Sequence, residues 1–240
     1  ASYDKYKGDK NHAFWYFDKE MADATEKYYA NERGKTEQYI GFEQKGKLIT
    51  FNPKSHVRMS PSFQPEADGV TFPLKAVYTD TLRNEYSKEH STHPIRMSRI
   101  CGPVEVVNDT TFTVRFYRMG LDNPKRTGGI CLMASVKQDH KYRSAVQQVE
   151  IRIPYRNKEG IPQRIIFPKL SDVKASVKEI SLNGTADSGL PVYYYVKEGP
   201  AEIKGDKLVL TKIPPRAKFP VKVTVVAWQY GRSGEPKVQT

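Results

Sequence analysis

The sequence predicts a mostly β fold, built from antiparallel β-sandwiches with one helix near the start of the chain. Residues 188–213 and 219–231 alternate apolar and polar positions, as in Val192, Tyr194 and Val196, which is typical of strands with one buried face. Glycine and proline interrupt this pattern at Gly199-Pro200, where the chain must reverse sharply. The chain also holds 15 tyrosines, a residue type that favours sheets.

The N-terminal helix is expected over about residues 13–33, with Gly34 as a suitable stop. Apolar residues recur there at spacings of three and four and form one stripe: Phe14, Phe17, Met21, Ala24 and Tyr28. Such a stripe usually anchors a helix to a sheet, so we expect it to pack in the core. The alternative is that the aromatic cluster around Trp15 stacks on a carbohydrate.

Strands and turns follow from Gln38 onward. A hairpin is expected around Lys45-Gly46, and alternation places Phe112, Val114 and Phe116 on one face of a later strand. Seven or eight such strands after one helix fit an antiparallel, jelly-roll-like sandwich. Residues 80–94 are polar and are expected to form a long exposed loop, a common place for functional residues.

Two domains are expected, because Pro168 breaks the strand pattern before a second set of strands begins. The first would span residues 1–168, with the helix and the larger sandwich. The second would span residues 169–240 and form a smaller sandwich.

The net charge of +12 indicates an anionic partner, such as an acidic polysaccharide, nucleic acid or lipid head groups, although it also suits a basic surface without a specific ligand. Basic and acidic residues are interspersed, and no helix-turn-helix, RNP-like motif or dense Lys/Arg helix occurs, so nucleic acid is not the expected partner. No apolar window approaches ~18 residues, so no membrane span is expected. Ala1 in place of a starting Met is interpreted as a mature terminus from which a leader was removed, or as the start of a piece cut from a longer protein.

Catalytic and cofactor motifs are not found. A glycine-rich phosphate loop, a G-x-S-x-G motif and zinc-binding spacings do not occur, so no cofactor or metal is expected. His90 and His93 could offer two metal ligands, but a third is not evident. Four carboxylates could be nominated for a glycosidase pair but are better explained as turn residues: Glu66, Asp68, Asp122 and Asp139.

Cys101 and Cys131 each lie in an apolar, strand-like run. They could be two buried free thiols, or they could form a disulfide between neighbouring strands in an exported protein. The sequence leaves their redox state open.

Ligand binding is expected on a face rich in arginine and tyrosine. An arginine fork suits carboxylate or sulfate groups, and a tyrosine ring suits the apolar face of a sugar. The alternative is a plain polar sheet face, or a face docked on another domain. The residues expected to contact the ligand are Arg115, Tyr117, Arg118 and Arg126, with Trp15 as an outside candidate.

The last 70 or so residues resemble the bacterial immunoglobulin-like repeat. The resemblance is carried by G-L-P-V-Y-Y-Y-V-K-E-G-P-A-E-I-K-G-D-K-L-V-L-T, residues 189–211, although I-P-P-R-A-K-F-P, residues 213–220, replaces the usual glycine turn. It implies a small immunoglobulin-like sandwich of the kind used as a spacer or adhesion unit, without catalytic residues.

The chain as a whole resembles the C-terminal region of large exported proteins from polysaccharide-utilisation systems of gut bacteria. Four stretches carry this resemblance: R-I-C-G-P-V-E, residues 109–123, Y-R-S-A-V-Q-Q and W-Q-Y-G-R-S. It implies a non-catalytic accessory segment at the periplasm or cell surface, beside a catalytic domain, with an oligo- or polysaccharide partner that is expected to be acidic. The alternatives are part of a glycoside hydrolase or lyase whose active site needs a further domain, and an adhesin-like spacer.

Overall fold

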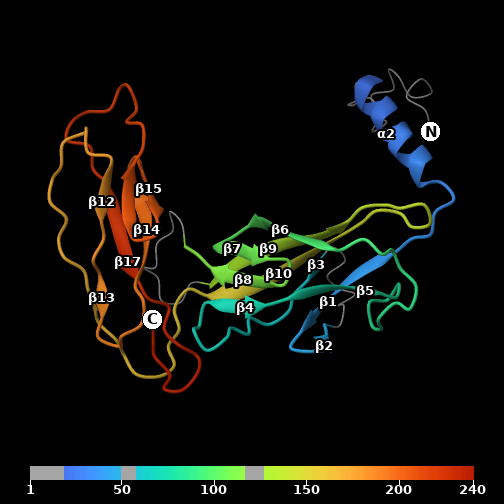
Figure 1. Ribbon diagram of the computed structural model, residues 1–240, viewed down its shortest axis with the longest axis horizontal. Coiled ribbons are helices and arrows are strands. Elements are labelled where there is room, and N and C mark those ends of the chain that lie inside the picture. Colours follow the sequence, from blue (N-terminus) through green and yellow to red (C-terminus); the bar gives the residue numbers. More distant parts are fainter. Residues whose placement is uncertain (1–18, 50–57, 117–126) are drawn as a thin grey trace.

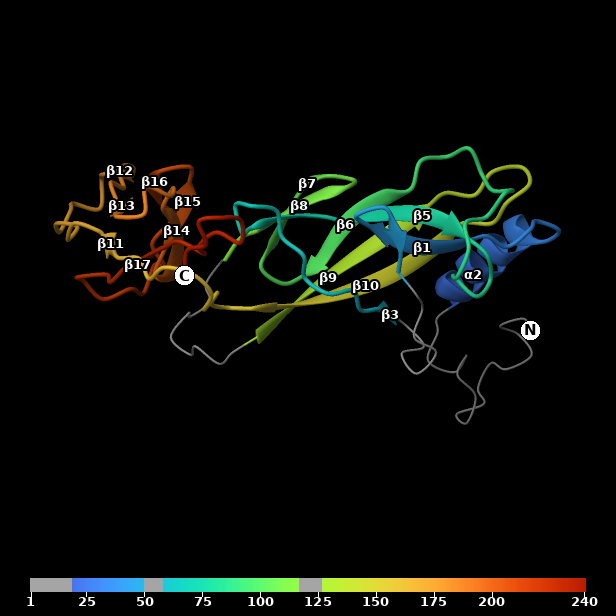
Figure 2. The same ribbon diagram turned by 90° about the horizontal axis from the view of Figure 1, so that it is seen from below.

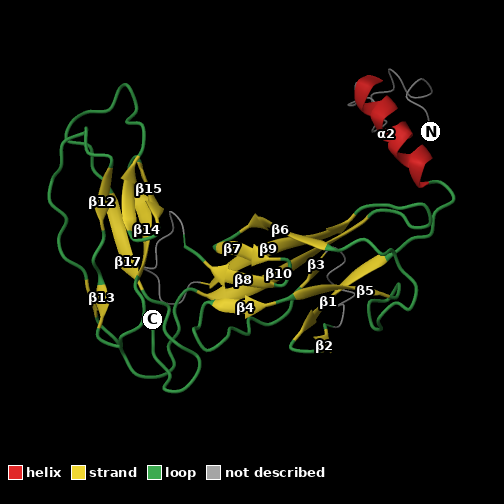
Figure 3. Ribbon diagram, viewed as in Figure 1, coloured by secondary structure: helices red, strands yellow, loops and turns green. Residues whose placement is uncertain are grey.

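The computed structural model describes residues 19–49, 58–116 and 127–240, and shows a mostly β molecule with a helix at one end (Figures 1 and 3). Apart from the parallel pair β3–β10, the strand pairs within its described sheets are antiparallel. The predicted fold class is therefore confirmed. In Figure 1, the first module extends along the molecule, and the strands of the second module run across that direction.

The first module contains ten described strands in three sheets, ordered β2-β1-β5, β3-β10-β9-β6 and β4-β8-β7. They are β1 (Tyr39–Gln44), β2 (Lys47–Leu48), β3 (Arg58–Met59), β4 (Thr71–Pro73), β5 (Lys75–Thr79), β6 (Arg96–Cys101), β7 (Val104–Asn108), β8 (Thr111–Val114), β9 (Thr127–Val136) and β10 (Ala145–Pro154). The buried side chains of these sheets form one core. Figure 2 shows the same sheets turned by 90°, with β9 and β10 running along the length of the module. The strands β9 and β10 are the longest of the module and pair along their whole length.

Alternation along the strands explains this core. Phe112, Val114 and Phe116 are all buried, as predicted, and they share one core with Phe42 of β1 and with Phe72 of β4, the register partner of Phe112. The hairpin predicted at Lys45-Gly46 is also confirmed. It joins β1 to β2, and both of its central residues have the positive φ that such a tight turn requires.

The second module contains seven described strands in three small sheets, ordered β12-β16-β15, β14-β17 and β11-β13. They are β11 (Ile165–Ile166), β12 (Glu179–Ser181), β13 (Thr185–Ala186), β14 (Tyr193–Glu198), β15 (Ala201–Lys204), β16 (Lys207–Leu210) and β17 (Thr224–Trp228). Leu182, Tyr194, Val196 and Leu208 are buried in a separate, smaller core, against which Phe167 packs. The boundary at residues 168 and 169 stays a prediction.

The strand β14 is buried on both faces, and the prediction of a single buried face is therefore wrong. Tyr194 and Val196 point into the core of the second module, whereas Tyr195 points into the core of the first. Its partner β17 places Trp228 in the first core as well. The cause is that the β14–β17 sheet has a core on each side. One face packs in the core of the second module, and the other face packs in the core of the first.

Aromatic rings fill this junction. The ring centroids of Phe116 and Trp228 lie 4.8 Å apart, and those of Phe116 and Tyr155 lie 5.6 Å apart, both nearly perpendicular. Tyr230 is also buried there, and its hydroxyl donates to the carbonyl oxygen of Pro154. Burial raises the pKa of Tyr230, so its phenol stays neutral and able to donate. The two modules therefore share part of one core.

The C-terminal tail adds a second connection between the modules. Val238 bridges both Arg232 and Ile161, and the side-chain amide of Asn157 donates to the carbonyl oxygen of Val238 over 2.9 Å. The backbone N–H of Thr240 donates to the carbonyl oxygen of Asn157 over 3.0 Å. The last residues thus fasten the segment through which the chain leaves β10.

The predicted helix is confirmed in the described part as α2, Lys19–Glu32, but its predicted packing in the core is wrong. Met21 and Tyr28 are 51% and 53% exposed, and Ala24 is exposed as well, while Phe14 and Phe17 lie outside the described residues. Figure 1 shows α2 standing beyond the end of the sheets. The guanidinium of Arg143 donates to the carbonyl oxygen of Glu32, which attaches the last turn of the helix to the loop between β9 and β10.

Candidate functional site

A group of positive charges lies at one end of the second module, where two loops meet. The first loop, residues 170–178, leads into β12, and the second, residues 211–223, joins β16 to β17. The backbone N–H of Leu210 donates to the carbonyl oxygen of Lys178 over 2.9 Å, so both loops leave the same end of the β12–β16 pair. In Figure 1 they lie above β12 and β15. We call this surface the basic end; its cations are Lys174, Lys178, Lys212, Arg216, Lys218 and Lys222.

Most of these charges are not neutralised by neighbouring acids. Lys222 pairs with Glu198 over 2.7 Å, and this contact lowers the pKa of that carboxyl. The other five cations are exposed and form no ion pair with a described residue. Asp172 is the sole acidic residue in the two loops. The basic end therefore carries a local excess of positive charge.

An exposed aromatic ring lies within this charged surface. Phe219 is 70% exposed, between Lys218 and Lys222 in the sequence. Two prolines, Pro214 and Pro215, stiffen the same loop, and a backbone hydrogen bond from Ala217 to Pro214 closes a turn within it. Positive charges beside an exposed ring suit a ligand that offers anionic groups and an apolar face.

Sequence reasoning missed this surface, although a signal for it was present. The net charge of the whole chain does not locate it, because acidic residues elsewhere offset part of the basic charge. Between Lys207 and Glu235 the sequence contains no acidic residue, but it contains Lys212, Arg216, Lys218, Lys222 and Arg232. A count over that shorter window would have indicated the basic end.

Arg115 is the one predicted ligand residue that the structure describes. Its guanidinium lies 3.2 Å from the carboxylate of Glu105 and 5.1 Å from the ring centroid of Tyr193, at the junction of the modules. These contacts agree with the alternative that this face is docked on another domain. They do not bear on ligand binding. Trp15, Tyr117, Arg118 and Arg126 lie outside the described residues, so their grouping stays a prediction.

A cavity of about 650 Å³ lies beside Arg115. Among the described residues that line it are three carboxylates, those of Glu105, Glu202 and Asp206, and one cation, Arg115. The described lining residues therefore carry more negative than positive charge, in contrast to the basic end.

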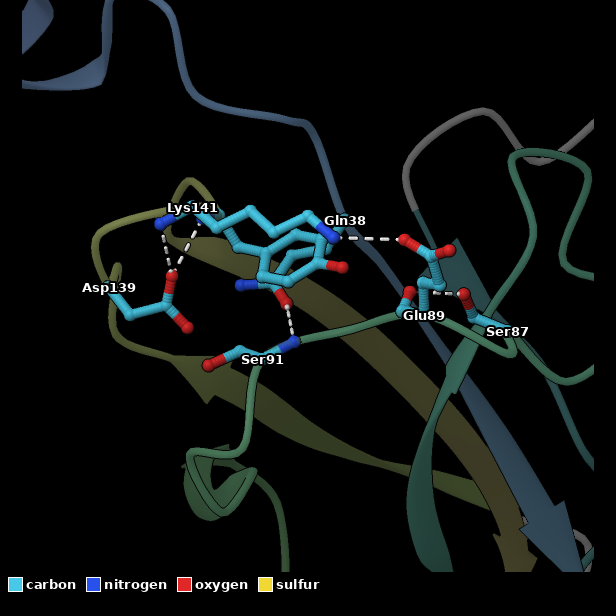
Figure 4. A network of polar contacts seen from close by, with 7 residues as sticks. Gln38, Ser87, Glu89, Ser91, Asp139 and Lys141 are labelled. Atoms are coloured by element: carbon cyan, nitrogen blue, oxygen red, sulfur yellow. Dashed lines mark hydrogen bonds and ion pairs between the residues drawn. The ribbon is translucent and has the colours of Figure 1, made fainter.

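A polar network joins three loops at the far end of the first module (Figure 4). Its core is Ser91, which is buried in the loop between β5 and β6. The backbone N–H of Ser91 donates to Gln38 over 3.3 Å, and the side-chain amide of Gln38 donates to the carbonyl oxygen of Arg143. Lys141 donates to Glu89 over 2.9 Å. The loop of residues 80–94 is therefore fastened at Ser91, although most of it is exposed, as predicted.

The described histidines, His90, His93 and His140, also lie in the loops at this end. The ring of His90 stacks on Tyr78 at 4.1 Å, and its Nδ1 lies 2.7 Å from the carbonyl oxygen of Ser91. Among the described residues, no group of three or more potential ligand side chains is placed to hold a metal ion. In the same part of the chain, no helix has the length and apolar composition that a membrane crossing requires.

Asp139 is the most strongly perturbed carboxyl of this network. The Ser91 hydroxyl and the backbone N–H groups of Tyr142 and Lys141 hold its pKa at about 2, below the ordinary 3.8. The interpretation of Asp139 as a turn residue is thus confirmed. Asp68 has the same role, because its carboxylate accepts from the N–H groups of Val70 and Thr71.

Replacing Asp139 with asparagine is expected to destabilise the chain in a pH-dependent way. The folded-state pKa lies below the unfolded one, so the carboxylate adds stability above pH 3.8, and that addition disappears as pH falls to about 2. Urea unfolding of both chains from neutral pH downward measures the difference. It should be constant near neutrality and shrink in acid, whereas a difference independent of pH would contradict the assignment.

Comparisons with known proteins add little to this picture. No protein-family model matches the chain, and no curated protein matches it. Among solved structures, Drosophila N-cadherin EC1-4 matches with a TM-score of 0.26 at 13% identity, covering 85% of this chain and 48% of that one. Human CDH23 EC21-23 gives a TM-score of 0.27 at 13% identity, with 79% and 63% covered.

A third structure, the protocadherin gammaB7 EC3-6 cis-dimer, gives a TM-score of 0.24 at 16% identity. It covers 77% of this chain, which spans 44% of the protocadherin chain. Such TM-scores carry no argument about ancestry or activity. The β-sandwich assignment rests on the strand pairing within the chain itself.

Proposed function

We propose that this chain is a non-catalytic accessory segment of an exported bacterial polysaccharide-processing protein, and that its basic end retains an acidic polysaccharide. The observation that carries the proposal is the set of five exposed cations in the two loops of the basic end that form no ion pair with a described residue, together with the exposed ring of Phe219 in one of these loops. A polymer with repeated carboxylate or sulfate groups could contact several of them at once. Each exposed contact is weak, but contacts along one chain add through effective concentration.

The shared core supports the accessory role. Because Trp228 and Tyr230 of the second module are buried in the core of the first, the basic end is held at a fixed position relative to the rest of the chain. Such a segment would present a bound polymer to a neighbouring catalytic domain in a constant orientation. The bacterial immunoglobulin-like repeat, used as a brace or spacer, fits the same role.

Charge reversal at the basic end is expected to abolish retention on gels that contain a uronic-acid or sulfated polymer. The variant Lys212→Glu/Arg216→Glu/Lys218→Glu should bind at least about tenfold more weakly, because attraction becomes repulsion. Affinity electrophoresis measures this change. Retention of the wild type should also fall between about 0.1 M and 1 M salt, as the Debye length shortens from ~10 Å to ~3 Å.

A matched control separates the site from the overall charge. The variant Lys47→Glu/Lys75→Glu/Lys88→Glu changes the net charge equally at exposed positions of the first module. It should keep most of its retention. Equal losses in both variants, or no loss in the first, would contradict a site at the basic end.

The residues predicted from the sequence give a second location for the same activity. A variant with alanine at Arg115, Tyr117, Arg118 and Arg126 should keep its retention if the polymer binds at the basic end. Loss of retention in this variant, with normal retention after charge reversal at residues 212–218, would move the site from the basic end to these four residues.

One observation favours the alternative of an enzyme. A cavity of about 550 Å³ beside β10 is lined by two carboxylates, Glu150 and Glu159, together with Tyr230. Both already have cationic neighbours, Arg152 at 3.9 Å and Lys237 at 3.2 Å. Release of reducing sugar by the wild type, with loss of this activity in Glu150→Gln and Glu159→Gln, would establish hydrolysis.

The remaining alternative is an adhesin-like spacer. A wild type that neither hydrolyses nor retains the polymer would favour it.

A further inference from the structure

The two cysteines of the chain lie directly opposite each other on neighbouring strands. Cys101 ends β6, and its register partner on β9 is Cys131. Opposed residues of an antiparallel pair have Cα atoms about 4.5 or 5.5 Å apart, and disulfides form at Cα separations of about 4.4–6.8 Å. Both thiols are free in this structure, Cys101 exposed and Cys131 half-buried.

A β-bulge creates this opposition. The register passes from Arg99–Leu132 to Cys101–Cys131, so Ile100 is an extra residue on β6. Without the bulge, Cys101 would oppose Ile130, whose side chain is fully buried in the core. The extra residue therefore turns Cys101 to the outer face of the sheet, the face on which Cys131 lies.

Arg99 and Gly102 stabilise the bulge. The guanidinium of Arg99 donates through Nε and Nη2 to the carbonyl oxygen of Gly102, over 3.0 and 2.9 Å. Gly102 has a φ of 97°, and a Cβ there would lie 2.3 Å from the carbonyl oxygen of Gly129. Only glycine allows the end of β6 to approach β9 so closely.

We propose that Cys101 and Cys131 form a reversible cross-strand disulfide by exchange with a disulfide oxidant such as glutathione disulfide. This goes beyond the proposed function and does not depend on it. Cys101, the more exposed thiol, attacks one glutathione sulfur as thiolate, forms a mixed disulfide and releases one glutathione thiolate. Cys131 then attacks the Cys101 sulfur and displaces the second glutathione. Two cysteine thiols are oxidised, one glutathione disulfide is reduced, and the two protons end on the two glutathione thiols.

The order of attack follows from the surroundings of the two thiols. Burial, and then the neighbouring Cys101, raise the pKa of Cys131, so its thiolate is less available to a free oxidant. Once Cys101 carries glutathione, the fixed register brings its sulfur next to Cys131. The cross-link would join the two ends of the segment 101–131 into a covalent loop. This segment contains β7, β8 and the start of β9.

Intact-mass spectrometry of the folded chain after incubation with glutathione disulfide and alkylation tests the proposal. The wild type should lose the mass of two hydrogens and retain no alkylatable thiol. Cys131→Ser should accumulate one glutathione adduct, and Cys101→Ser should react several-fold more slowly. Arg99→Ala keeps both thiols but loosens the bulge, so it should accumulate more mixed disulfide than the wild type.

The oxidised wild type should melt about 5–10 °C above the reduced form, because the closed loop restricts the unfolded chain. The double variant Cys101→Ser/Cys131→Ser should melt at the same temperature with and without oxidant. A wild type that forms glutathione adducts at both cysteines, or only dimers between chains, without an internal disulfide would overturn the proposal.

Discussion

Replacing Trp228 with alanine is expected to lower the free energy of unfolding by about 3–5 kcal/mol, a large share of the stability of an ordinary domain. The side chain is 2% exposed and contacts Phe116, Tyr193 and Tyr230 at the junction. Removing the indole leaves a cavity between the two modules. The modules cannot move together freely to fill this cavity, because the chain already connects them. Equilibrium unfolding in urea measures the loss.

Two comparison variants show whether the loss comes from the junction. Phe219→Ala removes an aromatic ring that is 70% exposed, and it should change the free energy of unfolding by less than about 0.5 kcal/mol. Trp228→Phe should cost about 1–2 kcal/mol, because most of the ring remains and the indole Nε1 has no hydrogen-bond partner among the described residues. Equal losses for Trp228→Ala and Phe219→Ala would contradict a shared core.

The second large effect is expected from Gly231→Ala, at the base of the C-terminal tail. Gly231 has a φ of 90°, and a Cβ there would lie 2.1 Å from the carbonyl oxygen of Val238. The backbone of the tail would have to move, which would break its bridge to Ile161. We expect a loss of about 3 kcal/mol in the free energy of unfolding.

Gly205→Ala is the matched control for this substitution. Gly205 also has a positive φ, 62°, but a Cβ there would meet no atom within 4 Å. It should lose only the conformational cost of about 1 kcal/mol. If the two variants lose the same stability in thermal unfolding, backbone conformation alone explains the effect, and the tail does not fasten the modules.

The strands were predictable because their signal is local. Phe112, Val114 and Phe116 alternate with polar residues, and Lys45-Gly46 has the composition of a tight turn, so neighbouring residues alone identify both elements. The helix was predictable for the same reason. Its packing was not, because Met21 and Tyr28 form an apolar stripe whether or not a sheet lies opposite.

Features that depend on tertiary arrangement were missed or left open. The double burial of β14 arises because a second module lies against Tyr195, which alternation within the strand does not reveal. The opposition of Cys101 and Cys131 depends on the bulge at Ile100, which shifts the register by one residue. The basic end depends on two loops, 170–178 and 211–223, that are far apart in sequence but leave the same end of one strand pair.

Differential scanning calorimetry of the wild type and Trp228→Ala tests most directly the central claim, that the two modules form one body carrying the basic end at a fixed position. The wild type should unfold in a single transition whose calorimetric and van't Hoff enthalpies agree. In Trp228→Ala, this transition should move to lower temperature or separate into two. Two separate transitions already in the wild type, unchanged by the substitution, would show that the modules fold independently and would contradict the claim.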